Sequence, residues 1–289
     1  TVLKGTIVSN KNGDELVLKL YYERIVKKVT YEYTGTIPAN APAVPAEKEY
    51  YAGSTVKVEE VPTLSGYSFN GWISQDASIT NGEFTMPATD VVLKGSFVAS
   101  EGTIYKVEHY LEDDTGYTLK ETTQHAGTTD TEANAIPGSY PSYTHNPDHP
   151  DAKESGIITG DGSLVLKVYY DRDPYEVTYK ITGDIIPAGI TVPTTKEYDW
   201  GTTVDVEAVL AVDGYVFYGW FTDDATVVGN QFEMPAYDVE FVGYFVKERA
   251  NYKIEHYVMD TEGNYPTDPT ESYEQSGDVG DEVTASYIT

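Results

Sequence analysis

Cysteine is absent from the 289 residues of the chain, which excludes disulfide bonds, thiolate metal sites and a cysteine nucleophile. Long hydrophobic runs are absent too: no stretch of 18 or more apolar residues occurs, so we expect no membrane insertion. Neither end has the basic start followed by an apolar run that marks a signal peptide. The chain starts directly in a strand-like run, so we expect it to be a piece of a longer protein.

Basic residues are scarce. Lys and Arg number 19 against 47 Asp and Glu, which gives a formal net charge of −28. Such a chain repels phosphate backbones and lacks the basic patch that nucleic-acid binding needs, and anionic membrane surfaces are disfavoured for the same reason. The simplest role of the acidic charge is solubility, because a strong net charge keeps repeated domains apart in solution.

Tyrosine is abundant, with 26 copies against 8 phenylalanines, and valine and threonine are frequent as well. These residue types favour a pleated, half-buried surface, and segments such as VTYEY (29–33) and LVLKVYY (164–170) have the length of strands. Acidic residues next to glycine, as in DDTG (113–116) and GDGS (160–163), predict hairpin turns. The proline-rich segment IPANAPAVPA (37–46) excludes a helix and a central strand. We therefore expect a mainly β fold.

Two halves of the chain repeat each other. LVLKLYYER at Leu16 recurs as LVLKVYYDR at Leu164, and VTYEYTG at Val29 recurs as VTYKITG at Val177, both at an offset of 148. GYSFNGW (66–72) and FTMPATDVVLKGSF (84–97) recur at the same offset as GYVFYGW and FEMPAYDVEFVGYF. YKVEHYLEDDTGY, from residue 105, recurs as YKIEHYVMDTEGNY from residue 252, at an offset of 147. A fixed offset of this kind indicates a tandem repeat.

Each period divides into two modules. The first contains the Gly-Trp motif and is called the GW module; the second contains Glu-His-Tyr and is called the EHY module. The predicted boundaries are 1–25 for the C-terminal part of an EHY module, 28–99 for the first GW module, 103–173 for a complete EHY module, 175–247 for the second GW module, and 250–289 for the N-terminal part of an EHY module. The linkers ASEGT and KERAN are short and polar, so we expect an elongated rod of small modules.

Aromatic residues at equivalent positions are the candidates for the module cores, and Gly71 and Gly219, directly before the tryptophans, predict a bulge or a close backbone approach. The predicted structural core contains Trp72, Trp220, Phe84, Phe232, Tyr105 and Tyr252.

The GW module, through GYSFNGW and FTMPATDVVLKGSF, resembles the Listeria–Bacteroides repeat, a family that includes the internalin B-repeat and has a compact β-grasp-like fold. The EHY module, through YKVEHYLEDDTGY and LVLKVYYDR, resembles the mucin-binding-protein type of repeat. The fold class expected from the strands and these resemblances together is tandem small β-grasp-like or β-sandwich-like modules. The resemblance implies an extracellular protein on the surface of a Gram-positive bacterium, attached to the cell wall in its full-length form.

Candidate chemistry is sparse, and we expect no enzyme and no obligatory cofactor. Adjacent acids such as Glu59 and Glu60, or Asp223 and Asp224, point to opposite faces of a strand and do not converge on one substrate. Weak metal candidates come from two loops. The acidic turn LEDDTG (111–116) offers the oxygen ligands that calcium takes, and the loop THNPDHPD (144–151) gathers His and Asp side chains that could hold a metal. These candidates are Asp113, Asp114, Asp148 and His149.

Two functions remain open. The first is a non-enzymatic stalk, whose partners are neighbouring repeats or other copies of the chain. The second is an adhesin that binds host mucin, glycan or matrix protein directly, through loops such as Pro38–Pro45 and Tyr140–Asp151. The two terminal parts together make one whole EHY module, so head-to-tail filaments of separate molecules are a further hypothesis. The alternative is that the chain is a piece cut from a longer array.

Overall fold

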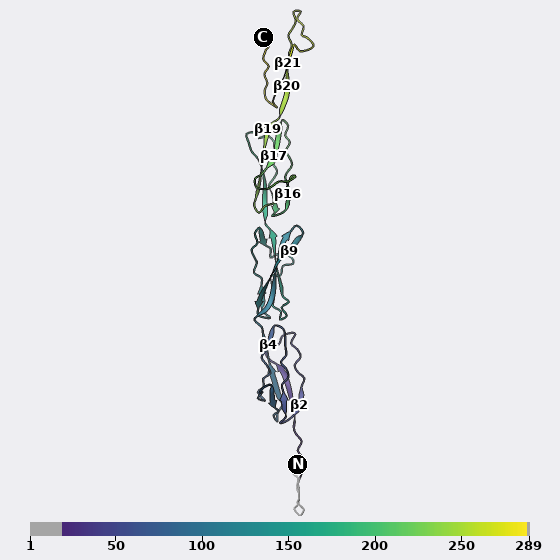
Figure 1. Cartoon of the computed structure of the whole chain (residues 1–289), viewed down its shortest axis with the longest axis vertical. Coiled ribbons are helices and arrows are strands. Elements are labelled where there is room, and N and C mark those ends of the chain that lie inside the picture. The colour runs from purple at the N-terminus through teal and green to yellow at the C-terminus, as the bar shows by residue number, and fades with distance from the viewer. Residues whose placement is uncertain (1–18, 288–289) are drawn as a thin grey trace, which may run out of the picture. The chain divides into compact units, whose positions relative to one another are not determined.

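The computed structural model describes residues 19–287, and in that range it consists of strands, turns and loops without a helix (Figure 1). The expectation of tandem β modules is therefore confirmed. Within the same residues there is no helix of the length and apolarity that crossing a membrane would require.

The first GW module has its first and last long strands side by side. β1 pairs with β6 in parallel and with β2 antiparallel, giving the order β2-β1-β6, while β3 pairs with β5 and β4 with β7. Parallel neighbours need a crossover, which here consists of short strands and proline-containing loops. The strands are β1 (Val26–Tyr33), β2 (Lys48–Tyr51), β3 (Thr55–Lys57), β4 (Tyr67–Phe69), β5 (Glu83–Thr85), β6 (Val91–Gly95) and β7 (Phe97–Ala99).

The core of this module follows from strand alternation. On β1, Val29 and Tyr31 point inward and are buried, whereas Glu32 points to solvent. Trp72 packs edge-on against Tyr31, with ring centroids 4.9 Å apart. The buried cluster is completed by Val56, Phe84, Met86, Val91 and Leu93.

The second GW module repeats this arrangement with longer strands. Its sheet order is β15-β14-β19-β17, with β14 and β19 parallel, and β16 pairs with β18. The register between β17 and β19 shifts between Phe217 and Trp220, which is the irregularity predicted at Gly219. The strands are β14 (Pro174–Ile181), β15 (Lys196–Asp199), β16 (Thr203–Asp205), β17 (Tyr215–Phe221), β18 (Gln231–Glu233) and β19 (Val239–Lys247).

The EHY module forms a sheet of order β11-β13-β8-β9, with β10 and β12 paired separately. β13 contributes side chains that are buried, among them Leu166, Val168 and Tyr170. The strands are β8 (Thr103–Asp113), β9 (Gly116–Gly127), β10 (Glu132–Asn134), β11 (Tyr143–His145), β12 (Ser155–Ile157) and β13 (Val165–Arg172).

The C-terminal part is an antiparallel hairpin of β20 (Arg249–His256) and β21 (Glu271–Asp278). It corresponds to β8 and β9 of the EHY module. Residues 19–25, the described end of the N-terminal part, form no strand, and residues 1–18 of that part lie outside the described residues.

The chain divides into two compact units by its internal contacts. Unit 1 contains the described residues up to Val107 with Thr122–Ala135 and Lys153–Leu166; unit 2 contains Glu108–Glu121, Ile136–Ala152 and the described residues from Lys167 onward. The division falls inside the EHY module, so each unit contains a GW module together with one portion of the EHY module. Each unit is described by itself below.

Candidate functional site

In unit 1, backbone hydrogen bonds join the first GW module to EHY residues. The Ser100 amide donates to the Gly66 carbonyl (2.8 Å), and the Thr129 amide donates to the Ser100 carbonyl (3.0 Å). The Tyr67 hydroxyl donates to the Asp130 carboxylate, and this hydrogen bond raises the pKa of Tyr67 to about 12. Residues from both modules are thus fixed by main-chain and side-chain contacts at the same place.

Two glycines make this junction close. A Cβ atom on Gly160 would lie 2.3 Å from the Ser65 carbonyl oxygen, and one on Gly66 would lie 2.3 Å from the Gly160 Cα atom. Gly66 also has a positive φ of 78°, a backbone conformation that residues with a side chain rarely adopt. The two backbones therefore pack against each other at a distance that excludes any side chain.

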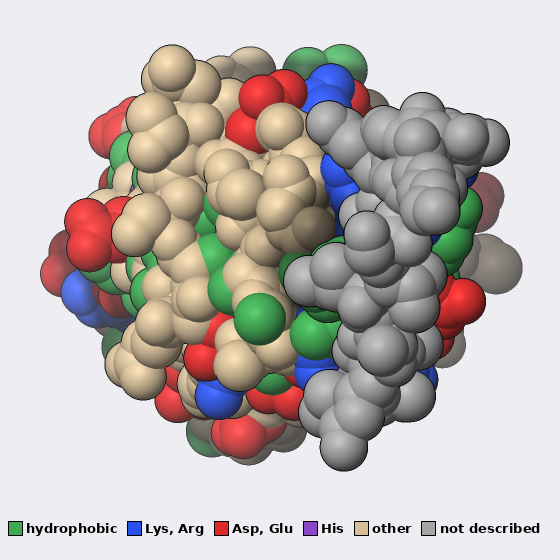
Figure 2. Space-filling model, turned by 90° about the horizontal axis from the view of Figure 1, so that it is seen from below, with side chains coloured by type: hydrophobic (Ala, Val, Ile, Leu, Met, Phe, Trp, Pro, Cys, Tyr) green, Lys and Arg blue, Asp and Glu red, His purple; other side chains and the backbone are tan. Residues whose placement is uncertain are grey.

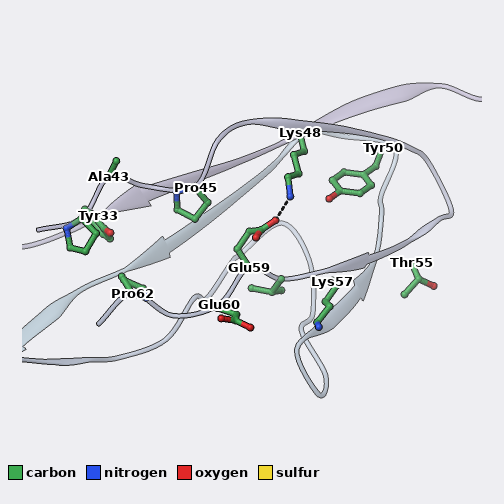
Figure 3. A pocket seen from close by; sticks show the side chains of 12 residues that line it. Tyr33, Ala43, Pro45, Lys48, Tyr50, Thr55, Lys57, Glu59, Glu60 and Pro62 are labelled. Atoms are coloured by element: carbon green, nitrogen blue, oxygen red, sulfur yellow. Dashed lines mark hydrogen bonds and ion pairs between the residues drawn. The ribbon is translucent and has the colours of Figure 1, made fainter. Parts of the chain in front are cut away.

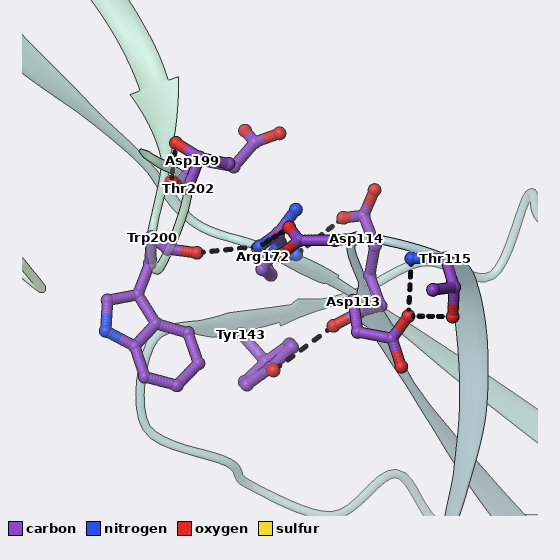
Figure 4. A network of polar contacts seen from close by, with 9 residues as sticks. Asp113, Asp114, Thr115, Tyr143, Arg172, Asp199, Trp200 and Thr202 are labelled. Atoms are coloured by element: carbon purple, nitrogen blue, oxygen red, sulfur yellow. Dashed lines mark hydrogen bonds and ion pairs between the residues drawn. The ribbon is translucent and has the colours of Figure 1, made fainter. Parts of the chain in front are cut away.

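In unit 2, Arg172 at the end of β13 joins the EHY module to the second GW module (Figure 4). Its Nη1 atom donates to Asp114 Oδ1 (2.9 Å) and to the Trp200 carbonyl (3.1 Å), while its backbone amide donates to Glu112 Oε2 (2.9 Å). Only 10% of the Arg172 side chain is exposed, against 74% for Asp114. The guanidinium thus contacts both modules from a nearly buried position.

The Trp200 ring adds an apolar contact to the same junction. It packs edge-on against Tyr143 of β11, with centroids 5.4 Å apart, and its backbone amide donates to the Asp173 carbonyl (3.0 Å). The position equivalent to Trp200 in the first GW module is Ala52. Sequence comparison between the copies draws attention to shared residues, and Trp200 was missed because only one copy has it.

The second GW module meets the hairpin β20–β21 by the same hydrogen-bond pattern as in unit 1. The Glu248 amide donates to the Gly214 carbonyl (2.9 Å), and the Val279 amide donates to the Glu248 carbonyl (2.8 Å). Lys247 Nζ lies 2.5 Å from Asp281 Oδ1, and this contact raises the pKa of Lys247. The backbone pattern of the junction is therefore part of the repeat, while the side chains around it differ.

An open cleft of about 840 Å³ lies on the first GW module beside the proline-rich segment (Figure 3). Its polar side includes an ion pair between Lys48 and Glu59, and the Glu59 amide donates to the Tyr31 hydroxyl (3.0 Å). The Tyr33 hydroxyl at the cleft is buried and has no hydrogen-bond partner among residues 19–287, and burial raises its pKa. Its rim includes Pro42, Ala43, Pro45 and Pro62. The predicted contact loop Pro38–Pro45 thus borders a cavity.

The four metal candidates hold separate structural positions. Asp113 accepts hydrogen bonds from the Thr115 hydroxyl and amide, which lower its pKa, and Asp114 pairs with Arg172. The Asp148 amide donates to Asn146 Oδ1 (3.1 Å), and the His149 ring stacks on Tyr169 with centroids 3.8 Å apart. Among residues 19–287, no group of three or more His, Asp or Glu side chains is arranged to hold a metal ion.

The predicted core residues fall into two groups. Trp72, Phe84 and Phe232 are buried, whereas Trp220, Tyr105 and Tyr252 are half-buried. Tyr105 stacks on His125 in the EHY module (centroids 5.5 Å), and Tyr252 donates from its hydroxyl to Gln275 Oε1 (2.7 Å) in the hairpin.

Charge is spread over the surface. On the face seen in Figure 2, acidic side chains lie scattered with single basic side chains among them, and no broad basic area is visible outside the grey atoms. Several of the few basic side chains are paired with acidic ones on the surface, as in Lys28–Glu47 (2.6 Å) and Lys196–Glu207 (2.5 Å). That the chain does not bind nucleic acid stays a prediction from its net charge of −28.

Comparison with known proteins shows what the GW modules are similar to. Residues 29–101 and 182–249 match the family described as the divergent InlB B-repeat domain, which covers just under half of the chain. No curated protein matches it. Among solved structures, the streptococcal "High Identity Repeats in Tandem (SHIRT) domains 3-4 from cell surface protein" is 14% identical over 50% of this chain and 98% of that one, with a TM-score of 0.21. The mucin-binding-type resemblance of the EHY module stays a prediction. The chain thus carries two domains similar to the InlB B-repeat within a tandem β array.

Proposed function

We propose that this chain is a non-enzymatic stalk segment of a bacterial surface protein, in which InlB-type GW modules alternate with mucin-binding-type EHY modules. The observation that carries the proposal is the repeated backbone junction. Gly66, Ser100 and Thr129 form it in unit 1, and Gly214, Glu248 and Val279 form it in unit 2. Main-chain hydrogen bonds hold neighbouring modules in one geometry without depending on side chains, which suits a spacer whose repeats must stack alike.

Small-angle X-ray scattering tests this role. A compact domain of this length has a radius of gyration of about 19 Å, and we expect a value at least about twice as large. The matched variant is Trp200→Ala, because alanine is the residue that the first GW module carries at this position. It should broaden the distance distribution without unfolding the modules. A compact radius for the native chain would contradict the stalk.

A second proposal, head-to-tail joining of copies, rests on the exposure of residues 19–25. Tyr21 and Tyr22 are 87% and 85% exposed, whereas their counterparts Tyr169 and Tyr170 in β13 are buried. Tyr169 stacks on Tyr110 (4.9 Å) and the Tyr170 hydroxyl bonds His109 Nδ1 (2.9 Å). The hairpin carries the matching side chains, Tyr257 and His256. We propose that Tyr21 and Tyr22 of one copy pack there on another.

Light scattering over a concentration series tests the joining. We expect mass to grow with concentration and with salt, because salt screens the repulsion between chains of charge −28. Changing Tyr21 and Tyr22 together to Asp should abolish the growth. Tyr51→Asp, a change to the residue that the second GW module has at that position, should leave it intact. A constant mass at all concentrations would end this proposal and leave the stalk proposal standing.

Direct adhesion to mucin, glycan or matrix protein is the alternative function. The cleft beside Pro42 and Pro45, with the buried Tyr33 hydroxyl, is the observation that favours it. Immobilised mucin and matrix proteins should retain the chain if this function holds, and Tyr33→Ile, the change to the residue at position 181, should weaken retention if the cleft is the site. No retention would favour the spacer alone.

A further inference from the structure

Three aromatic side chains form an exposed row on the second GW module. Tyr218 and Phe221 come from β17 and Tyr244 from β19, and they are 56%, 49% and 39% exposed. The Tyr244 ring lies nearly parallel to that of Tyr218, with centroids 5.0 Å apart, and to that of Phe221, at 6.0 Å. Exposed large apolar side chains that gather at one place commonly mark a binding surface.

The bulge at Gly219 explains how the row forms. In a regular strand, residues 218 and 221 would point to opposite faces of the sheet. Here the register of β17 against β19 shifts between Phe217 and Trp220, and Gly219 has a φ of 104°. Tyr218 and Phe221 therefore both meet Tyr244 outside, while Phe217 packs inward against Phe245 (4.8 Å).

The fold does not need these rings. The equivalent residues of the first GW module are Asn70, Ile73 and Ser96, and Asn70 Nδ2 donates to Ser96 Oγ (3.1 Å). The same two positions thus face each other in both modules, with an amide and a hydroxyl in one and two stacked tyrosines in the other. Because the first GW module forms without these rings, the requirements of the fold do not account for the aromatic row.

The charges around the row favour a neutral ligand. Neither tyrosine hydroxyl makes a hydrogen bond within residues 19–287, so both remain available to a ligand. Lys180 and Phe221 pair with Val242 from opposite sides. The Lys180 Nζ atom lies 3.9 Å from Glu240 Oε1, which reduces the attraction of this cation for an anionic ligand. Anionic sugars and nucleobases on a phosphate backbone are further repelled by the net charge of −28.

The size of the row argues against a protein partner. Three half-exposed aromatic side chains offer on the order of 300 Å², whereas a stable protein interface needs about 800 Å² from each partner. A sugar ring matches this scale. Because Tyr244 stacks between Tyr218 and Phe221, the ring faces left open are the outer ones of these two side chains, and the axial C–H groups of one pyranose would cover one such face. We propose that Tyr218, Phe221 and Tyr244 bind neutral carbohydrate, one or two pyranose rings at a time. This inference gives the adhesive alternative a site and a ligand class, and the stalk does not depend on it.

Saturation-transfer NMR on the full chain tests the site. The probes are neutral oligosaccharides based on galactose, N-acetylglucosamine, N-acetylgalactosamine, glucose and mannose, together with sialylated and sulfated forms. We expect millimolar binding of at least one neutral probe, and at least tenfold weaker binding of its sialylated or sulfated form. Absence of binding to every neutral probe would overturn the proposal.

Substitutions taken from the other module locate the binding. The triple variant Tyr218→Asn, Phe221→Ile, Tyr244→Ser copies the first GW module and should reduce binding at least tenfold. Tyr237→Thr, likewise copied from that module but outside the row, should change it less than twofold. Equal sugar binding by the triple variant and the native chain would overturn the proposal. It would also be overturned if the native chain gained mass with concentration and the triple variant did not, since the row would then join copies of the chain. An unchanged scattering curve would show that the stalk persists in either case.

Discussion

Tyr67 offers a titration of the junction in unit 1. Its hydrogen bond to Asp130 raises the pKa to about 12, since an ionised phenolate beside the carboxylate would lose the bond and face a like charge. NMR of tyrosine ring carbons should show Tyr67 titrating near this value, and Asp130→Asn should lower it. Tyr110, whose pKa is raised to about 12 by Glu108, is the internal control. An unchanged Tyr67 titration in the variant would contradict the contact.

The same pKa fixes the pH range of the junction. A folded-state pKa above the ordinary value of 10.0 means that the contribution of Tyr67 is complete below pH 10 and is lost as the pH rises through about 12. The Thr129 amide, which donates to the Ser100 carbonyl, should therefore be protected from hydrogen exchange at neutral pH.

Phe232 and Phe221 separate core from surface within one module. Phe232 is 3% exposed and packs on Phe241 (5.4 Å), so Phe232→Ala should destabilise the second GW module by about 3–5 kcal/mol. Phe221 belongs to the exposed row, so Phe221→Ala should cost less than about 1 kcal/mol. Hydrogen exchange read by mass spectrometry along the chain gives both values, and similar losses would contradict the assignment of the row to the surface.

At the scale of the elements, the close contact between Gly66 and Gly160 predicts that an added side chain destabilises the junction of unit 1. The added methyl of Gly160→Ala would meet backbone atoms at 2.3 Å, so the two segments must separate, at a cost of about 1–3 kcal/mol. Faster hydrogen exchange should follow at Ser100 and Thr129. Gly102→Ala is the control, because nothing lies within 4 Å of its added Cβ. Equal effects of the two variants would mean that the close approach does not support the junction.

At this scale, the sequence predicts the features that the two copies of the repeat share. Strand-forming segments, the turn at DDTG and the irregularity at Gly219 recur or follow local rules, so the mainly β modules were predictable from the sequence. Burial was harder: Tyr105 and Tyr252 carry the repeated motif, yet they lie half-buried on strand faces. Trp200 and the row at Tyr218 were not found, because a search for repetition passes over residues that differ between copies.

For the molecule as a whole, the excess of acidic residues predicts how salt changes the melting temperature. The charge of −28 repels itself, and the Debye length falls from about 30 Å at 0.01 M to about 8 Å at 0.15 M salt. Exposed ion pairs such as Lys28–Glu47 weaken with salt but contribute little. Screening of repulsion therefore dominates, and we expect the melting temperature to rise by a few degrees as NaCl increases over this range.

Calcium at matched ionic strength distinguishes screening from a specific site. Asp113 accepts hydrogen bonds from Thr115 and Asp114 pairs with Arg172, so a cation would have to displace these partners. We expect CaCl₂ and MgCl₂ to raise the melting temperature equally at equal ionic strength. A larger rise with calcium, abolished by Asp113→Asn but not by Asp223→Asn, would instead establish a calcium site at the β8–β9 turn. That turn holds Asp114 against Arg172, so calcium would then compete directly with the junction that joins the EHY module to the second GW module.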